Sequence, residues 1–168
     1  SMRIPFIPAL SVGTDIVRTN RITDLFFREN SKLERFAKRV LHPSELQLLE
    51  SRTPRWRTPD VDDFSLQARV ATYIAGRWAA KEAAKKAWGA SILGFQDLRV
   101  EVNPDEGHVQ IVCAPHDQKN DDPLEQAAKL SISHDGDYAV ATVLATPLHE
   151  GLKAELTKRI AEANEKVS

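Results

Sequence analysis

The chain has 168 residues, of which 42% are hydrophobic and 28% charged, and its formal net charge is −1. This length favours one domain with its own core, since domains usually run to roughly 100–200 residues. The single cysteine, Cys113, excludes a disulfide framework and a multi-cysteine zinc site, so a reducing compartment is the default. No run of about 18 apolar residues is present, so we expect no membrane span, and no stretch has the pattern of a secretory signal.

The small net charge hides two regions of opposite sign. Residues 17–40 hold seven basic and three acidic residues, a local net of +4, whereas residues 97–126 hold two basic and eight acidic residues, a net of −6. Such a charge dipole is typical of a protein with an acidic partner or an anionic ligand. Two solvated faces that happen to differ in sign would give the same counts.

Hydrophobic periodicity predicts the elements of the first half in chain order. A β-branched apolar run indicates a strand, helical spacing begins at Asn20, and two further helices follow before a loop and a long alanine-rich helix. The loop, TPRWRTPDVDDF, holds two prolines and three aspartates, and we expect it to be exposed. The expected ranges after the strand at 9–17 and the helix from 20 are helices at 33–41 and 43–52, the loop at 53–64 and the long helix at 65–88.

The second half alternates strands and turns. A hairpin is expected from two strands around a turn at 103–107, and a second strand pair surrounds the turn signal HDGD at 134–137. Asp122-Pro123 predicts the start of a short helix. The expected ranges are strands at 98–102 and 109–114, a helix at 122–130, strands at 130–133 and 138–145, and an amphipathic helix at 149–167. The order predicts an α+β fold, with helices laid over a mostly antiparallel sheet.

An aspartate interrupts the first apolar strand, in the segment VGTDIV at residues 12–17. Burial of a lone carboxylate is costly unless a cation or a metal ion lies beside it, so Asp15 is a candidate ligand. Taken alone, a position at the strand end, where Asp15 caps the following helix, is the simpler explanation.

Basic residues recur along the long predicted helix, in the segment GRWAAKEAAKKA at residues 76–87. Arg77, Lys81 and Lys85 follow at intervals of four and share one stripe, and Glu82 and Lys86 form an i, i+4 pair beside them. Such a row suits a phosphate-rich ligand. The alternative is a solvated face with a surface ion pair worth about 0.3–0.5 kcal/mol.

A histidine follows the strand predicted at 130–133, in the segment LSISHDGDYAVA at residues 130–141. His134 could face a ligand from the end of a buried strand. A histidine in such a place is more often a structural residue, so this segment alone decides nothing.

Together the three segments resemble the holo-[acyl-carrier-protein] synthase family, the small phosphopantetheinyl transferases. The family's Gly-X-Asp-Ile motif is met by residues 13–16, its Lys-Glu-Ala helix motif by residues 77–83, and its Ser-Ile-Ser/Thr-His strand pair by residues 131–141. The segments RFAKRVL and FQDL, at 35–41 and 95–98, are also similar to family segments. The resemblance covers about residues 10–145, and it implies a phosphopantetheinyl transferase domain over 3–147 followed by a helical extension over 148–168.

The resemblance implies transfer of the 4′-phosphopantetheine arm of coenzyme A to a serine of apo acyl carrier protein, with adenosine 3′,5′-bisphosphate as the leaving group. Asp15 and Glu82 would hold Mg²⁺, which takes one or two carboxylates plus substrate phosphates. Glu82 would also accept the serine proton, and Lys86 would ease departure of the leaving group. The residues implied to contact coenzyme A are Arg77, Lys81, Lys86, Ser133 and His134.

The resemblance also implies partners. An acidic carrier protein would dock on the basic segment, and the implied contacts are Arg21, Arg35, Phe36 and Arg39. Family members form homotrimers with active sites between neighbouring subunits, so we expect that assembly here. The loop at 53–64 and the helical tail are similar to fungal versions that serve mitochondrial carrier protein. A mitochondrial location is therefore the expectation, with a bacterial cytoplasmic one as the alternative.

The sequence departs from the family pattern at two loops, and two other functions are compatible with its length and charge. Residues 89–94 keep only part of the family's Gly-Thr-Gly-Ile-Gly loop, and residues 106–109 replace its Asn-Gly-Lys-Pro turn. Larger phosphopantetheinyl transferases, which serve synthase carrier domains, are about twice this length, although a broad carrier range remains open. A non-catalytic anion- or nucleic-acid-binding module is the other rival. The chain lacks an RNA-recognition signature and strong overall basicity, so we expect no nucleic-acid partner.

Overall fold

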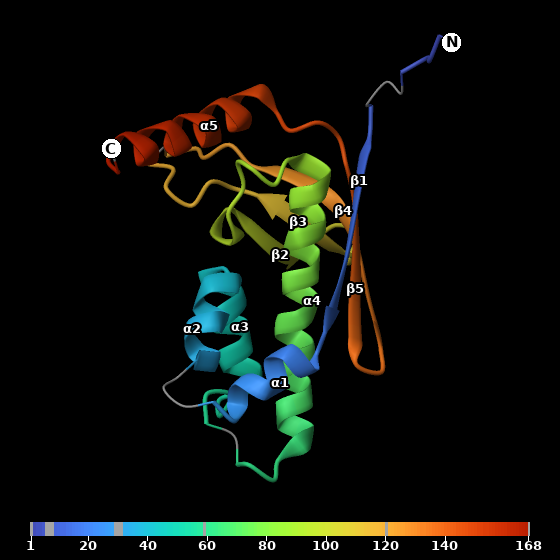
Figure 1. The fold of residues 1–168 in the computed structure, drawn as a ribbon, viewed down its shortest axis with the longest axis vertical. Coiled ribbons are helices and arrows are strands. Elements are labelled where there is room, and N and C mark those ends of the chain that lie inside the picture. The colour runs from blue at the N-terminus through green and yellow to red at the C-terminus, as the bar shows by residue number, and fades with distance from the viewer. Residues whose placement is uncertain (1, 6–8, 29–31, 59, 120, 168) are drawn as a thin grey trace.

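The computed structural model describes residues 2–5, 9–28, 32–58, 60–119 and 121–167. One antiparallel sheet of five strands, in the order β1-β5-β4-β3-β2, carries a long helix across one face (Figure 1). No helix of these described ranges has the length and apolar character to cross a bilayer. The elements are β1 Ser11–Arg18, α1 Asn20–Phe26, α2 Lys32–Val40, α3 Pro43–Arg52, α4 Phe64–Trp88, a 3₁₀ turn η1 Phe95–Asp97, β2 Leu98–Val102, β3 Val109–Cys113, β4 Gln126–Asp135, β5 Tyr138–Ala145 and α5 Glu150–Glu165.

The predicted α+β fold, with a mostly antiparallel sheet under a long helix, is confirmed. The long helix α4 begins where Asp63 caps it, with the Asp63 carboxylate accepting from the Leu66 amide at 3.0 Å. It ends at Gly89, whose φ of +132° lies outside the range that other residues adopt easily. The small α4 side chains at 79, 80, 83 and 84 are fully buried, and this lets the helix lie close to β1 and β5.

The predicted helix at 122–130 is wrong, because the chain enters strand β4 at Gln126. Exposure then alternates along the strand, with Ala128 and Leu130 buried beneath α4 and Lys129 exposed between them. Residues 126–129 pair with β3, and the ladder outweighs the helix preference of an Ala-Ala-Lys-Leu run. The strand also extends to Asp135, so the tight turn before β5 is confined to Gly136 and Asp137.

The loop before α4 is exposed over most of its length, as predicted, but Trp56 is wholly buried in the core. Beside it, the Arg57 guanidinium stacks 4.6 Å from the Trp56 ring centre and pairs with Glu34 of α2 and Glu50 of α3. The loop is therefore anchored against both helices, which its prolines and aspartates did not reveal.

The C-terminal helix α5 belongs to the same core as the rest of the chain, since Leu152 and Leu156 are fully buried in it. Arg159 of this helix donates from Nη1 to the buried carboxylate of Asp97 at 2.6 Å. Burial raises the pKa of Asp97, but hydrogen bonds from Arg159, Gly94 and His116 outweigh it, and the pKa lies below its ordinary value of 3.8. The helix thus supplies the countercharge for an acid at the start of β2.

Arg159→Leu should lower the free energy of unfolding by about 3 kcal/mol at pH 7, because it leaves the Asp97 carboxylate buried without its main cation. Denaturant melts followed by circular dichroism measure the change. Lys158→Leu is the matched control, since its side chain is 78% exposed, and we expect a change within about 0.5 kcal/mol.

The same pair of variants gives a pH dependence. Because the pKa of Asp97 is lowered in the folded state, its contribution is complete at neutral pH and is lost as the pH falls below 3.8. The gap between wild type and Arg159→Leu should shrink in that range, and a gap that stays constant would contradict the assignment.

Candidate active site

The candidate site forms where β1 lies against α4. A side chain at Gly13 would place its Cβ 1.9 Å from the backbone oxygen of Ala83, so only glycine permits this approach. Successive strand residues point to opposite faces, so Asp15 faces α4 like Gly13. Asp15 lies in the middle of β1, and the following helix is instead preceded by Thr19, so the helix-capping explanation does not hold.

Lys86 supplies the cation beside Asp15. Its Nζ lies 3.0 Å from Asp15 Oδ1 and 2.8 Å from the backbone oxygen of Thr14. Glu82 stands one turn earlier on α4 and pairs with Lys85 at 3.5 Å, so the predicted pair of Glu82 with Lys86 is not formed. Asp15 thus meets Lys86 across the β1–α4 contact, and Glu82 meets Lys85 one turn earlier on the same helix.

The donor set fits a hard divalent cation completed by a ligand. Asp15 and Glu82 side chains are 20% and 32% exposed, so each offers oxygens to solvent, and the ammonium of Lys86 shows that Asp15 accepts positive charge. Among the described residues, no group of three or more His, Cys, Asp or Glu side chains could hold a metal. Two carboxylates suit Mg²⁺, which usually relies on substrate phosphates and water for its remaining ligands.

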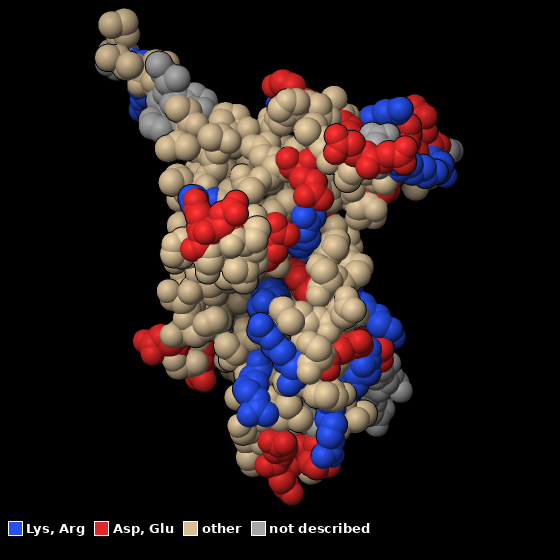
Figure 2. Space-filling model, turned by 180° about the vertical axis from the view of Figure 1, so that it is seen from behind, with Lys and Arg blue, Asp and Glu red and all other residues tan. Residues whose placement is uncertain are grey.

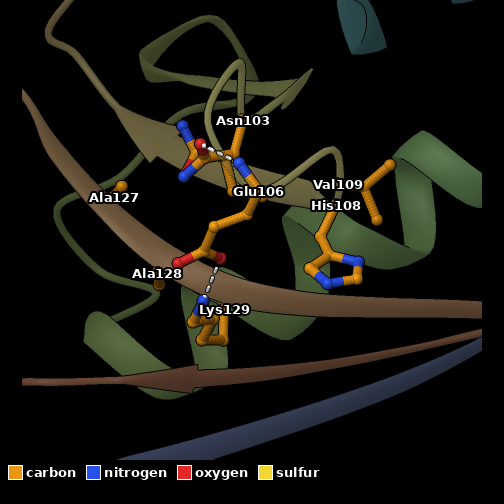
Figure 3. Close-up of a pocket in the computed structure, with 8 residues that line it drawn as sticks. Asn103, Glu106, His108, Val109, Ala127, Ala128 and Lys129 are labelled. Atoms are coloured by element: carbon orange, nitrogen blue, oxygen red, sulfur yellow. Dashed lines mark hydrogen bonds and ion pairs between the residues drawn. The ribbon is translucent and has the colours of Figure 1, made fainter.

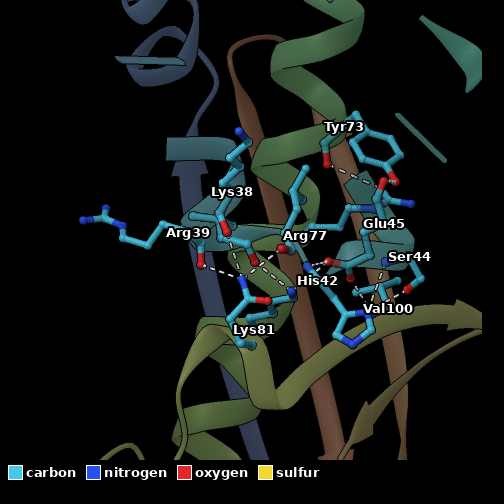
Figure 4. A network of polar contacts seen from close by, with 12 residues as sticks. Lys38, Arg39, His42, Ser44, Glu45, Tyr73, Arg77, Lys81 and Val100 are labelled. Atoms are coloured by element: carbon cyan, nitrogen blue, oxygen red, sulfur yellow. Dashed lines mark hydrogen bonds and ion pairs between the residues drawn. The ribbon is translucent and has the colours of Figure 1, made fainter. Parts of the chain in front are cut away.

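His134 of β4 lies against α4 at Gly76, whereas the Arg77 side chain is directed toward Tyr73 and Glu45 (Figure 4). A Cβ at Gly76 would lie 3.2 Å from His134 Nε2, so the imidazole rests on α4 at this glycine. The Arg77 guanidinium stacks 3.5 Å from the Tyr73 ring centre, and desolvation by burial lowers the pKa of Arg77. Its Nε is buried without a hydrogen-bond partner in the described part of the chain.

Ser133 does not join this group. Ile132 and His134 approach α4, so Ser133 between them points to the opposite face of the sheet, where it is paired with Val140 of β5. The predicted contact of Ser133 with coenzyme A therefore has no counterpart on the α4 side.

Lys81 is removed from the surface altogether. Its side chain is 0% exposed, and its Nζ lies 2.7 Å from Glu45 Oε2 and 2.7 Å from the backbone oxygen of Val40 (Figure 4). Burial lowers the pKa of Lys81, although the Glu45 carboxylate opposes that effect. The shared stripe of Arg77, Lys81 and Lys85 thus divides in space, and Glu45 is a site-forming residue that the sequence patterns did not single out.

Two of the four predicted docking residues contact one indole ring, and a third contacts the phenyl ring beside it. Arg21 lies 4.4 Å from the Trp78 ring centre, Phe36 meets Trp78 edge-on at 5.0 Å, and Arg39 lies 5.4 Å from the Phe36 ring centre. Arg35 is exposed on α2. We call Arg21, Arg35, Phe36, Arg39 and Trp78 the basic aromatic face. Figure 2 shows Lys and Arg side chains crossing the half of the molecule that holds α1 and α2. Trp78 is central here, and its place within the helix motif was the only hint of it.

A separate hollow of about 220 Å³ lies between the β2–β3 hairpin and β4 (Figure 3). The Glu106 carboxylate pairs with Lys129 across it, and Asn103 holds the turn by accepting from the amides of Asp105 and Glu106. None of the predicted site residues lines it. The buried Cys113 thiol has its pKa raised to about 12 by desolvation, so it is not a nucleophile at neutral pH.

Comparison with known proteins shows the class of protein to which this chain belongs. Residues 11–143 match the family model of the 4′-phosphopantetheinyl transferase superfamily. The chain is 40% identical over 149 residues to "4′-phosphopantetheinyl transferase B, mitochondrial" of Aspergillus fumigatus, covering 84% of this chain and 97% of that protein. It is 36% identical over 112 residues to a holo-[acyl-carrier-protein] synthase of Streptococcus thermophilus, covering 66% and 76%.

Among solved structures, the fold is similar to Helicobacter pylori holo-[acyl-carrier-protein] synthase in complex with coenzyme A. The TM-score is 0.50 at 26% identity, covering 79% of this chain and 96% of that one. The chain belongs to the 4′-phosphopantetheinyl transferase superfamily. It is an enzyme of the holo-[acyl-carrier-protein] synthase type.

Proposed function

We propose that this enzyme transfers the 4′-phosphopantetheine arm of coenzyme A to a serine of apo acyl carrier protein, using Asp15, Glu82 and Lys86. The observation that carries the proposal is the close β1–α4 contact, which sets Asp15 against Lys86, one turn from Glu82. The serine oxygen forms a bond to the β-phosphorus of coenzyme A, and the bond to the leaving 3′,5′-bisphosphate breaks. Positioning and charge neutralisation provide most of the catalysis in such transfers.

Each side chain then has a stated task. Asp15 and Glu82 would hold Mg²⁺, which when bound supplies charge neutralisation for the pyrophosphate. Glu82 accepts the serine proton, directly or through one water. Lys86 donates to a phosphate oxygen and balances charge on the leaving group. We infer that Arg77 and His134 contact the 3′-phosphate end of coenzyme A, where a guanidinium can donate to phosphate oxygens.

Incubation with coenzyme A, Mg²⁺ and apo carrier protein should add one phosphopantetheine arm to the carrier, as measured by intact-protein mass spectrometry. Glu82→Gln, which keeps the side-chain shape, should reduce kcat by at least about 100-fold through loss of the base and of a metal ligand. A chelator should abolish transfer, and excess Mg²⁺ should restore it. If the carrier protein still gains this mass with chelator present and with the Glu82→Gln variant, the metal mechanism is wrong.

We propose that the carrier protein docks on the basic aromatic face. Its arginines are exposed, and their rings and cations support one another around Trp78, which keeps long side chains in place for an acidic partner. Charge complementarity of this kind acts mainly on encounter and affinity for the carrier.

Arg39→Glu should therefore raise the KM for carrier protein about tenfold or more while leaving the KM for coenzyme A within about twofold. Steady-state kinetics with each substrate varied in turn measure the two constants. Arg55→Glu, an exposed charge reversal on the 53–64 loop, is the control. Equal effects of Arg39→Glu on both substrates would count against this docking face.

We propose that the enzyme assembles as a homotrimer through the sheet face opposite α4. Val12, Ile16 and Leu144 point to that face and are 65%, 59% and 44% exposed, and no element of the described chain covers them. Exposed apolar side chains in adjoining strand positions are typical of an interface. Ser133 lies on the same face, where a neighbouring subunit would approach it.

Leu144→Asp should reduce the mass measured by light scattering at micromolar concentration and lower activity with it, because a charge in the buried interface opposes association. Val102→Asp, on an exposed valine of the β2–β3 hairpin, should leave the mass unchanged. A wild-type monomer with full activity would rule out sites shared between subunits.

We also propose a mitochondrial location, supported by the relative from Aspergillus fumigatus whose name states it. Cell fractionation with a tagged full-length protein would test this. Recovery with cytosolic markers alone would be the contrary result.

A further inference from the structure

A buried charge on α4 is tied to the end of the helix that carries the basic aromatic face. Lys81 Nζ donates to the backbone oxygen of Val40, the last residue of α2, and to Glu45 at the start of α3. The two charged side chains are 0% and 2% exposed, so water does not compete for them. The Lys81 ammonium therefore binds groups of the protein itself, at the α2–α3 junction.

Glu45 is in turn held from three directions (Figure 4). Its Oε1 accepts from the Val100 amide of β2 at 2.6 Å, and its Oε2 accepts from the His42 amide at 2.7 Å. The Tyr73 hydroxyl of α4 donates to its backbone oxygen at 2.6 Å. The carboxylate that receives Lys81 therefore has a fixed place relative to β2, α3 and α4.

Most backbone carbonyl groups at the end of α2 accept hydrogen bonds from side chains of other elements. The last carbonyls of a helix lack partners within the helix. Here Gln96 donates to the backbone oxygens of Lys38, Arg39 and Leu41, at 3.0, 3.2 and 2.9 Å, and Lys81 takes that of Val40. An ammonium at a helix C-terminus also opposes the negative end of the helix dipole. Position and tilt of α2 thus depend on α4 and η1.

Stability alone does not account for this arrangement. Replacement of a buried ion pair by apolar residues of similar volume is often neutral or stabilising, because desolvation cancels most of the attraction. Hydrogen bonds with defined directions instead fix how two helices are set against each other, which apolar contact does less well.

We propose that Lys81 is a positioning residue that sets α2, with its three residues of the basic aromatic face, relative to Asp15 and Glu82. The inference rests on the proposed function. Glu82 follows Lys81 directly on α4, and Lys86 holds Asp15, so α4 carries β1 on one side and α2 on the other. A carrier docked on α2 brings its serine to the phosphate only if that spacing is kept. A 1 Å misplacement of reacting groups costs about 100-fold in rate.

The test is the double variant Lys81→Met/Glu45→Gln, which removes both charges at similar volume and leaves no unpaired buried ion. We expect a melting temperature close to that of wild type and a kcat for carrier transfer lower by between about 10-fold and 100-fold. The KM for carrier and the Kd for coenzyme A should stay within about twofold, because neither binding surface has lost a contact. Arg69→Met removes an exposed cation from the same helix and should match wild type in all four measurements.

A folded double variant with wild-type kcat would overturn the proposal. So would a fall in coenzyme A affinity that parallels the fall in kcat, which would instead make Lys81 a contact of coenzyme A. If the double variant does not fold, Glu45→Gln alone carries the test, with a smaller kcat loss expected and wild-type kcat as the contrary result. Failure of the wild-type enzyme to modify any carrier would instead contradict the proposed function itself. That outcome is measured separately, by mass spectrometry of the carrier after reaction with the wild-type enzyme.

Discussion

The close contact between β1 and α4 is the constraint on which the rest of the molecule depends. It requires a residue without a side chain at position 13 and small side chains along the facing side of α4. The backbone of β1 then lies directly against the backbone of α4. Asp15, two residues after Gly13, and Lys86, three residues after Ala83, are therefore brought together. Asp15 and Lys86 meet for this reason, although 71 residues separate them in the chain. Loss of that contact would disperse the candidate site without altering any of its polar residues.

One helix presents its cations to three different environments. Lys81 is enclosed with a carboxylate, Lys86 stands at a solvent-exposed edge beside Asp15, and Arg77 lies half-covered against a tyrosine ring. Burial lowers the pKa of both Lys81 and Arg77. Basic residues on one helix can thus have different roles, because burial and the nearest opposite charge set the pKa and the binding partner of each one.

The sequence was sufficient for the α+β class, the order of most elements and the place of Asp15 and Glu82, because periodicity and short motifs report local geometry directly. It failed where a partner distant in the chain decides the outcome. The run before Leu130 has helix-forming residues, yet pairing with β3 makes it a strand. Spacing placed Lys81 on a stripe with Arg77. Only the packing of α3, which brings Glu45 from 36 residues away, shows that Lys81 is enclosed.

Trp56 shows the same limit for loops. The composition of residues 53–64 predicted an exposed loop, whereas tertiary packing buries the Trp56 ring. Trp78 was visible within the helix motif, but its contacts with Arg21 and Phe36 depend on α1 and α2 folding over α4. Contacts of this kind arise between elements and leave no local signal in residue spacing.

The link between Asp97 and Arg159 spans 62 residues, and this has a consequence for synthesis of the protein. At about 5–20 residues per second, the ribosome adds Arg159 roughly 3–12 seconds after Asp97. During that interval the carboxylate has no countercharge from α5, and burying it would be costly. We therefore expect the segment around η1 and β2 to reach its final packing only after α5 has been made.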